Sequence, residues 1–150
     1  MGVLSSLTEE IKNAMRSKDT LKLESLRAIK SAVLLSETAS GSTGELSDEE
    51  AIKLLQRLVK QRKDSAAIFR EQNRPDLAEP EEAQAAVIAT FLPEQLSDEE
   101  VAKVIRDLIS STGAEGMKDM GKVMGMASKQ LAGKADGKRI ADLVKKSLGA

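Results

Sequence analysis

The interior of this 150-residue chain must be built almost without aromatic side chains, because the sequence holds two phenylalanines and neither tyrosine nor tryptophan. Leucine, isoleucine, valine, methionine and alanine are left to fill the core. These residues suit helix-on-helix packing, whereas sheet cores rely on β-branched and aromatic residues. No segment alternates apolar and polar residues convincingly, as a half-buried strand would. The sequence therefore predicts an all-α fold.

Apolar residues at helical spacing, together with start and stop signals, predict seven helices. Ser47 and Ser97 each begin the sequence Ser-Asp-Glu-Glu, a capping-box start, and Ser6 with Glu9 predicts another capping box. Gly113 marks a stop. The predicted helices cover residues 6–18, 20–37, 47–72, 83–91, 98–112, 118–131 and 136–149, with a small polar loop over 38–45.

Prolines divide the chain further. Pro80 is expected in the first turn of the fourth helix, where a missing N–H costs little, and Pro93 follows the end of that helix. We expect the boundary between two subdomains near residues 93–97. The predicted organisation is an N-terminal helical subdomain of about four helices over residues 1–93, followed by a small C-terminal three-helix bundle over residues 97–150.

The missing residue types exclude several kinds of chemistry. Without cysteine there are no disulfides or thiolate nucleophiles, and without histidine no Ser-His-Asp triad can form. No glycine-rich phosphate loop is present. Adjacent carboxylates such as Glu49 and Glu50 point about 100° apart on a helix and do not converge on one substrate. We therefore expect no catalysis by this chain alone, no cofactor and no metal site.

The location of the protein is predicted from its N-terminus and its apolar runs. The first 15 residues lack the apolar core of a signal peptide, and no run approaches the roughly 18 residues of a membrane span. A chain without cysteine is also compatible with a reducing compartment. The expectation is a cytoplasmic protein with no membrane contact.

Charge is distributed unevenly along the chain. Residues 38–112 hold 15 acidic and 9 basic residues, whereas residues 113–150 hold 8 basic and 4 acidic ones. Such an asymmetry indicates a basic interaction module in the C-terminal part.

The predicted helix over residues 118–131 separates its lysines from its apolar residues. At about 100° per residue, Lys118, Lys122 and Lys129 point in nearly the same direction. Gly125 lies among these lysines, and another backbone could approach there. Met120, Val123, Met124, Ala127 and Leu131 take the opposite side.

Two interpretations of this basic stripe remain open. It is either a surface that contacts the phosphate backbone of a nucleic acid, or a solvated lysine face in which glycine allows close packing. The lack of aromatics excludes base-stacking platforms, so a bound nucleic acid would be recognised by shape and backbone. The candidate RNA-binding residues are Lys118, Lys122, Gly125, Lys129, Lys134, Lys138 and Arg139.

Six segments stand in order along nearly the whole chain: residues 26–32 (LRAIKSA), 60–65 (KQRKDS), 74–78 (RPDLA), 91–97 (FLPEQLS), 120–125 (MGKVMG) and 133–138 (GKADGK). Each is weak alone, but together they are specific. In this order they resemble the GatB/YqeY family. The sequence departs from the family pattern at Pro80, where the family usually continues a helix, and at Pro75, where the family tends to have an acidic or polar residue.

The resemblance implies the same all-α fold, in the stand-alone YqeY-like form. A related module is the C-terminal tail of the B subunit of Asp/Glu-tRNA amidotransferase, a carbon–nitrogen ligase with glutamine as amido-N-donor. There the tail contacts tRNA, while the chemistry lies in domains that are absent here. The resemblance thus implies a non-catalytic tRNA-binding accessory module. The alternative is a protein-interaction module that docks on an amidotransferase subunit or an aminoacyl-tRNA synthetase, through the acidic middle or an apolar patch between subdomains.

Overall fold

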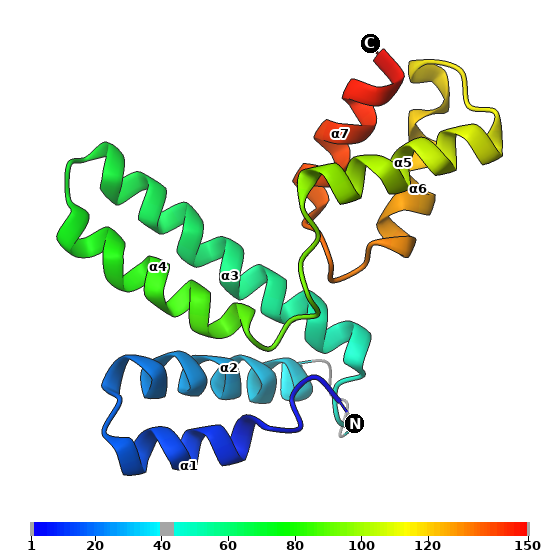
Figure 1. Ribbon diagram of the computed structural model, residues 1–150. Coiled ribbons are helices and arrows are strands. Elements are labelled where there is room, and N and C mark those ends of the chain that lie inside the picture. Colours follow the sequence, from blue (N-terminus) through cyan, green and yellow to red (C-terminus); the bar gives the residue numbers. More distant parts are fainter. Residues whose placement is uncertain (1, 40–43, 150) are drawn as a thin grey trace. The chain divides into compact units, whose positions relative to one another are not determined.

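The computed structural model describes residues 2–39 and 44–149, which form helices, turns and loops and contain no strand (Figure 1). The predicted all-α fold is confirmed. The helices are α1 Leu7–Ser17, α2 Thr20–Ala39, α3 Asp48–Glu71, α4 Pro75–Ala89, α5 Asp98–Thr112, the short 3₁₀ turn η1 Met117–Asp119, α6 Met120–Gln130 and α7 Gly137–Gly149. The loop predicted over 38–45 begins later, because Thr38 and Ala39 belong to α2, and residues 40–43 lie outside the described residues.

The chain divides into two compact units, Met1–Pro93 and Glu94–Ala150. The first, unit 1, contains α1 to α4, and the second, unit 2, contains α5 to α7 with η1.

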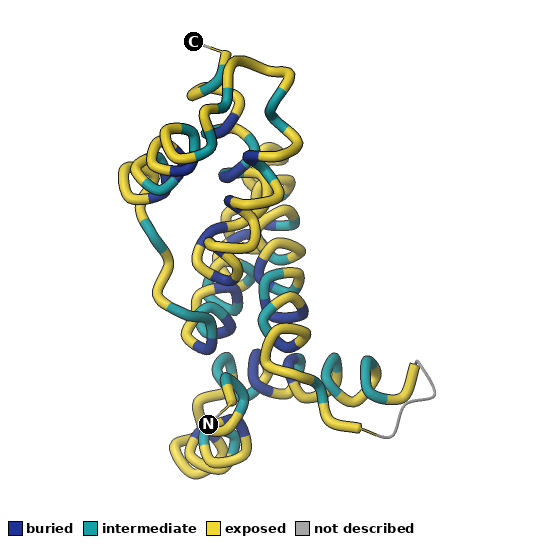
Figure 2. Tube along the Cα trace, turned by 90° about the vertical axis from the view of Figure 1, so that its right-hand side faces the viewer, coloured by how far each residue is buried: buried dark blue, intermediate teal, exposed yellow. Residues whose placement is uncertain are grey.

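Unit 1 consists of two helical hairpins, α1–α2 and α3–α4, with α4 also packed on α2. Its core is aliphatic except for Phe91, and Leu26, Ile29, Leu55 and Ile88 are fully buried within it. Figure 2 shows buried residues alternating with exposed ones along the helices, as amphipathic helices require. Removing a side chain of this size from water contributes about 1.5–3 kcal/mol.

Unit 2 packs α5, α6 and α7 around a second core that contains no aromatic residue. Val101, Ile105, Val123, Leu131 and Val144 are nearly or completely buried. Both phenylalanines of the chain belong to unit 1. Aliphatic side chains therefore suffice to close the three-helix bundle that carries the basic residues.

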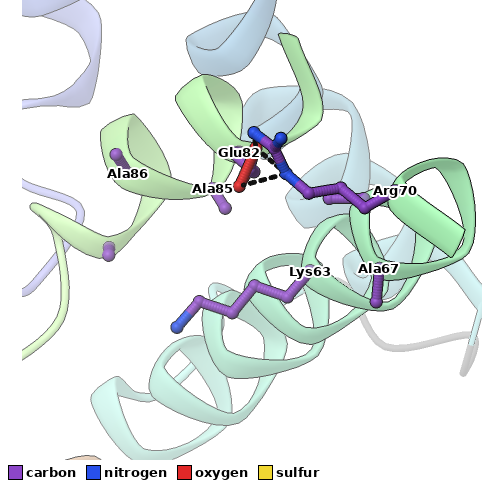
Figure 3. A pocket seen from close by; sticks show the side chains of 8 residues that line it. Lys63, Ala67, Arg70, Glu82, Ala85 and Ala86 are labelled. Carbon is purple, nitrogen blue, oxygen red and sulfur yellow. Dashed lines mark hydrogen bonds and ion pairs between the residues drawn. The ribbon is translucent and has the colours of Figure 1, made fainter. Parts of the chain in front are cut away.

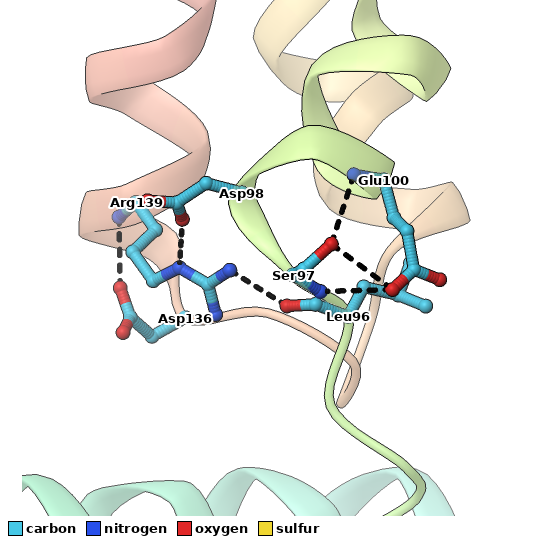
Figure 4. Close-up of polar contacts among 6 residues, drawn as sticks. All are labelled: Leu96, Ser97, Asp98, Glu100, Asp136 and Arg139. Carbon is cyan, nitrogen blue, oxygen red and sulfur yellow. Dashed lines mark hydrogen bonds and ion pairs between the residues drawn. The ribbon is translucent and has the colours of Figure 1, made fainter.

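The start of α5 has the predicted capping box. Ser97 Oγ accepts from the backbone N–H of Glu100 at 3.2 Å, and Glu100 Oε1 accepts from the backbone N–H of Ser97 at 3.3 Å (Figure 4). At the start of α3, Ser47 Oγ accepts from the N–H of Glu50, but the Glu50 side chain does not accept from the Ser47 N–H, so the capping box predicted there is only half formed. Gly113 ends α5 in the left-handed conformation with φ +69°, as expected of a C-terminal glycine.

The capping box predicted at Ser6 is wrong. The backbone of Ser6 is already helical, at φ −91° and ψ −4°, and its hydroxyl donates to Glu10 instead of accepting from a backbone N–H. An N-cap side chain reaches the first helical N–H groups from an extended backbone. The turn before α1, in which Leu7 N–H donates to the carbonyl of Leu4, removes that geometry.

The predicted start of the fourth helix is also wrong, because α4 begins at Pro75. Pro75 takes the first helical position, where its missing N–H has no partner to lose. Pro80 lies inside the helix on its exposed side, and a proline there costs about 3 kcal/mol in lost hydrogen bonding and crowding. Packing of α4 against α2 and α3 offsets that cost. The helix ends at Ala89, so Phe91 lies beyond it, buried in the core.

Candidate nucleic-acid interface

The predicted basic surface centres on α6, but Lys118 is not part of that helix. Gly116 has φ +69°, and the chain makes the 3₁₀ turn η1 before α6 begins at Met120. Asp119 Oδ2 accepts from the backbone N–H of Glu115 at 2.7 Å and so stabilises this turn. The angle assigned to Lys118 on a continuous helix therefore does not apply, although its side chain is exposed.

Lys122 and Lys129 lie on the solvent side of α6, two turns apart. Both are exposed, whereas Val123 and Ala127 on the other side of the helix are completely buried. Met120 and Met124 are half-buried and pack against the core of unit 2. The separation of lysines from apolar residues predicted for this helix is thus present.

Gly125 leaves bare backbone between these two lysines. It is exposed, and a Cβ built at this position would have no atom within 4 Å outside its own helix; the same holds for Gly121. Glycine inside a helix costs about 1 kcal/mol relative to alanine. No packing within the described chain requires these glycines, which argues against the interpretation that they permit close internal packing.

Lys134 lies in the connection between α6 and α7, and Lys138 follows it in α7. Lys134 lies in the turn, where its carbonyl accepts from the backbone N–H of Leu96 at 2.9 Å while its side chain is exposed. Lys138 is exposed in the first turn of α7. Lys145 was not among the predicted residues, yet it is exposed seven residues further along the same side of α7. The seven-residue spacing was the signal that would have identified it.

The Arg139 side chain forms hydrogen bonds within unit 2. Its Nε donates to Asp98 Oδ1 at 2.9 Å and its Nη2 donates to the carbonyl of Leu96 at 2.7 Å (Figure 4). Its backbone N–H donates to Asp136 Oδ1 at 2.8 Å, so the Asp136 side chain caps the start of α7. The half-buried guanidinium therefore joins the start of α7 to the start of α5.

The lysines of this surface are not engaged in ion pairs within the described part of unit 2. Within residues 94–149, none of Lys118, Lys122, Lys129, Lys134 and Lys138 forms an ion pair with another described residue, while Arg139 pairs with Asp98. Ammonium groups without carboxylate partners are available to phosphate.

The described residues offer little for other kinds of site. They contain no group of three or more acidic side chains placed to hold a metal ion. None of the helices in this part of the chain is both long enough and apolar enough to cross a bilayer.

The fold and this surface define a small helical protein with a basic three-helix bundle at its C-terminal end. The chain belongs to the YqeY-like family, whose model, described as Yqey-like protein, matches residues 4–148. This family is related to the C-terminal tail of the amidotransferase B subunit.

The chain is also similar to several curated proteins. Altered inheritance of mitochondria protein 41 of Pyrenophora tritici-repentis is 30% identical over 99% of this chain and 82% of the relative. Its namesake in Clavispora lusitaniae is 35% identical over 75% of this chain and 65% of the relative. The protein of the same name in Vanderwaltozyma polyspora is 31% identical over 76% of this chain and 64% of the relative. The chain thus spans just under two thirds of the latter two relatives.

The expected cytoplasmic location is contradicted by these relatives. Each of the three is named as a mitochondrial protein.

Proposed function

We propose that unit 2 binds tRNA through the exposed side of α6, as an accessory module that performs no chemistry itself. The observation that carries this proposal is the arrangement of Lys122 and Lys129 on either side of the bare backbone at Gly125. Lys118, Lys134 and Lys138 add positive charge in the neighbouring turns. Arg139 is left out of the contact, because Asp98 and Leu96 already engage its guanidinium.

The physical basis is neutralisation of phosphates. Two lysines seven residues apart on a helix are separated by about 10.5 Å along its axis, so they reach different phosphates of one strand. Each neutralised phosphate releases counterions, which supplies affinity that falls as salt rises. Gly125 has no side chain to hold a sugar–phosphate backbone away from the helix.

The composition of unit 2 restricts how RNA would be read. It contains no aromatic residue on which an unstacked base could lie. Recognition would therefore depend on the shape and backbone of a folded RNA, with affinity similar for many tRNAs.

Charge reversal with a matched control tests the proposal. Binding of the full chain to folded tRNA is measured by fluorescence titration at several salt concentrations. The tRNAs include mitochondrial ones, because the relatives are named as mitochondrial proteins. Lys122→Glu with Lys129→Glu should weaken binding of all tRNAs alike, by about tenfold or more at low salt, and flatten the salt dependence. The control is Lys103→Glu with Arg106→Glu, which changes charge equally at exposed positions of α5.

The control pair should retain most of the affinity. Absence of binding to any tRNA at low salt would overturn the proposal. So would a control pair that weakens binding as much as the α6 pair, because affinity would then depend on net charge and not on this helix.

A further inference from the structure

A groove of about 510 Å³ lies between α3 and α4 in unit 1. Its floor consists of Ala66 and Ala85, both buried, and its walls include the exposed Ala67 and Ala86. Because all four side chains are methyl groups, the two helices leave a space that larger side chains would fill. The lining is mostly apolar and is independent of the basic surface of unit 2.

The walls of the groove follow helical spacing over two turns. Lys63, Ala67 and Arg70 are at i, i+4 and i+7 on α3, and Glu82, Ala86 and Ala89 are at the same spacing on α4. Two turns extend about 10.5 Å along a helix. Small residues on both walls allow a third helix axis to approach to the 8–10 Å typical of packed helices.

One end of the groove is closed by an ion pair. Arg70 Nε donates to Glu82 Oε1 at 3.1 Å and Nη2 donates to the same carboxylate (Figure 3). The hydrogen bonds and charge of Glu82 raise the pKa of the Arg70 guanidinium. This cation is therefore neutralised within unit 1 and leaves no charge for an anionic partner.

The remaining cation of the groove, Lys63, is unpaired. Its ammonium group forms no ion pair with another described residue, and the adjacent Asp64 is engaged by Lys60 at 2.7 Å. Figure 3 shows the Lys63 side chain extending from α3 without a polar partner among the residues drawn. The groove thus combines an apolar floor with one uncompensated positive charge.

We infer that this groove receives an amphipathic helix of another protein, with aliphatic side chains at i, i+4 and i+7 in the groove and a carboxylate opposite Lys63. Helix-in-groove recognition uses anchors at this spacing. A nucleic acid fits poorly, because the alanine floor offers nothing to phosphate and Arg70 is already neutralised. A second copy of this chain is disfavoured in a symmetric interface, because two uncompensated Lys63 groups would be buried together.

A synthetic peptide tests this inference on the full chain. The probe is a helical peptide of about 15 residues with leucines at i, i+4 and i+7 and one glutamate beside them; a scrambled peptide of the same composition is its control. Backbone amide shifts of the protein are followed by NMR. Saturable shifts are expected at residues 63–70 and 82–89 with the first peptide only.

Variants then test the groove and the charge separately. Ala86→Lys fills the groove and should weaken peptide binding about tenfold or more. Gln61→Lys adds the same charge at an exposed position on the opposite side of α3, and should leave binding unchanged. A peptide with lysine in place of glutamate should bind the natural protein about tenfold more weakly, and should regain affinity for Lys63→Glu.

Circular dichroism confirms that each variant is folded. Absence of peptide binding, shifts at the exposed Leu34 and Leu35 instead of the groove, or equal effects of the two lysine insertions would each overturn the inference. A dimer of the full chain that Ala86→Lys dissociates in sedimentation experiments would assign the groove to a second copy and would also overturn it.

Discussion

Arg139 in the first turn of α7 and Asp98 in the first turn of α5 form an ion pair, with Nε donating to Oδ1 at 2.9 Å. The two residues are 41 positions apart in the sequence. The same guanidinium donates to the carbonyl of Leu96, just before α5. Arg139 therefore holds the segment that leads into α5 against the start of α7.

Replacement of Arg139 should destabilise unit 2. Arg139→Ala is expected to lower its free energy of unfolding by about 1–2 kcal/mol, because the Leu96 carbonyl loses a charged donor and the ion pair is lost. Asp98→Asn should cost less than about 1 kcal/mol, because Asp98 is largely exposed. Urea unfolding followed through NMR signals of unit 2 gives both values.

Arg106→Ala provides the control for Arg139. This arginine is exposed on α5 and has no ion-pair partner among the described residues, so its loss should change stability by less than about 0.5 kcal/mol. If the two alanine substitutions lowered stability equally, Arg139 would not stabilise unit 2 by joining the starts of α5 and α7.

The three serines that begin helices should differ in their effect on stability. Ser97→Ala and Ser47→Ala should each cost about 1 kcal/mol, because each hydroxyl accepts from a backbone N–H at the helix start. Ser6→Ala should change the free energy of unfolding by only a few tenths of a kcal/mol, because Ser6 makes no such bond. Unfolding of each unit, monitored separately, checks the order; a Ser6 effect as large as that of Ser97 would contradict it.

Local sequence predicts helices better than it predicts how they begin. Ser6, Ser47 and Ser97 each precede a glutamate by three residues, yet only the latter two have the extended backbone that capping needs. The backbone of Ser6 is set by the turn formed by the residues before it. Likewise, Pro75 and Pro80 both suit a first turn, and packing of α4 against two other helices decides between them.

The candidate site likewise contains residues whose positions local sequence predicts and one whose role it does not predict. The positions of Lys122, Lys129 and Gly125 follow from helical periodicity alone, and the structure has them on the exposed side of α6. Arg139 has no local signal that distinguishes it from Lys138. Its partners lie about 40 residues away in sequence, so only the packing of α5 against α7 reveals its internal role.

The carboxyl group of Asp76 should titrate at unusually low pH. The Arg74 guanidinium hydrogen-bonds both oxygens of Asp76, at 3.0 and 2.9 Å, and lowers its pKa below the ordinary value of 3.8. Because the folded-state pKa is depressed, the stability that this pair contributes is present above pH about 4 and is lost as the pH falls through the folded pKa.

Carboxyl-carbon NMR titration of Asp76 measures this shift directly. Arg74→Gln should move the pKa of Asp76 upward. Arg70→Gln should leave it unchanged, since Arg70 pairs with Glu82. A pKa of Asp76 that does not respond to Arg74→Gln would show that the guanidinium is not the cause.

Substitution of Gly125 should change the stability of unit 2 and its affinity for tRNA in opposite directions. Gly125→Ala should stabilise unit 2 by about 1 kcal/mol, because alanine is the better helix former and its Cβ meets no atom within 4 Å. If a sugar–phosphate backbone crosses α6 there, the same methyl group should weaken tRNA binding several-fold while every lysine is retained.

Gly121→Ala, one turn earlier and equally unobstructed, should give a similar gain in stability with a smaller loss of binding, because Gly121 does not lie between Lys122 and Lys129. Unfolding and tRNA titration of both variants check this, and a stabilised Gly125→Ala protein with unchanged affinity would show that the bare backbone is not part of the contact.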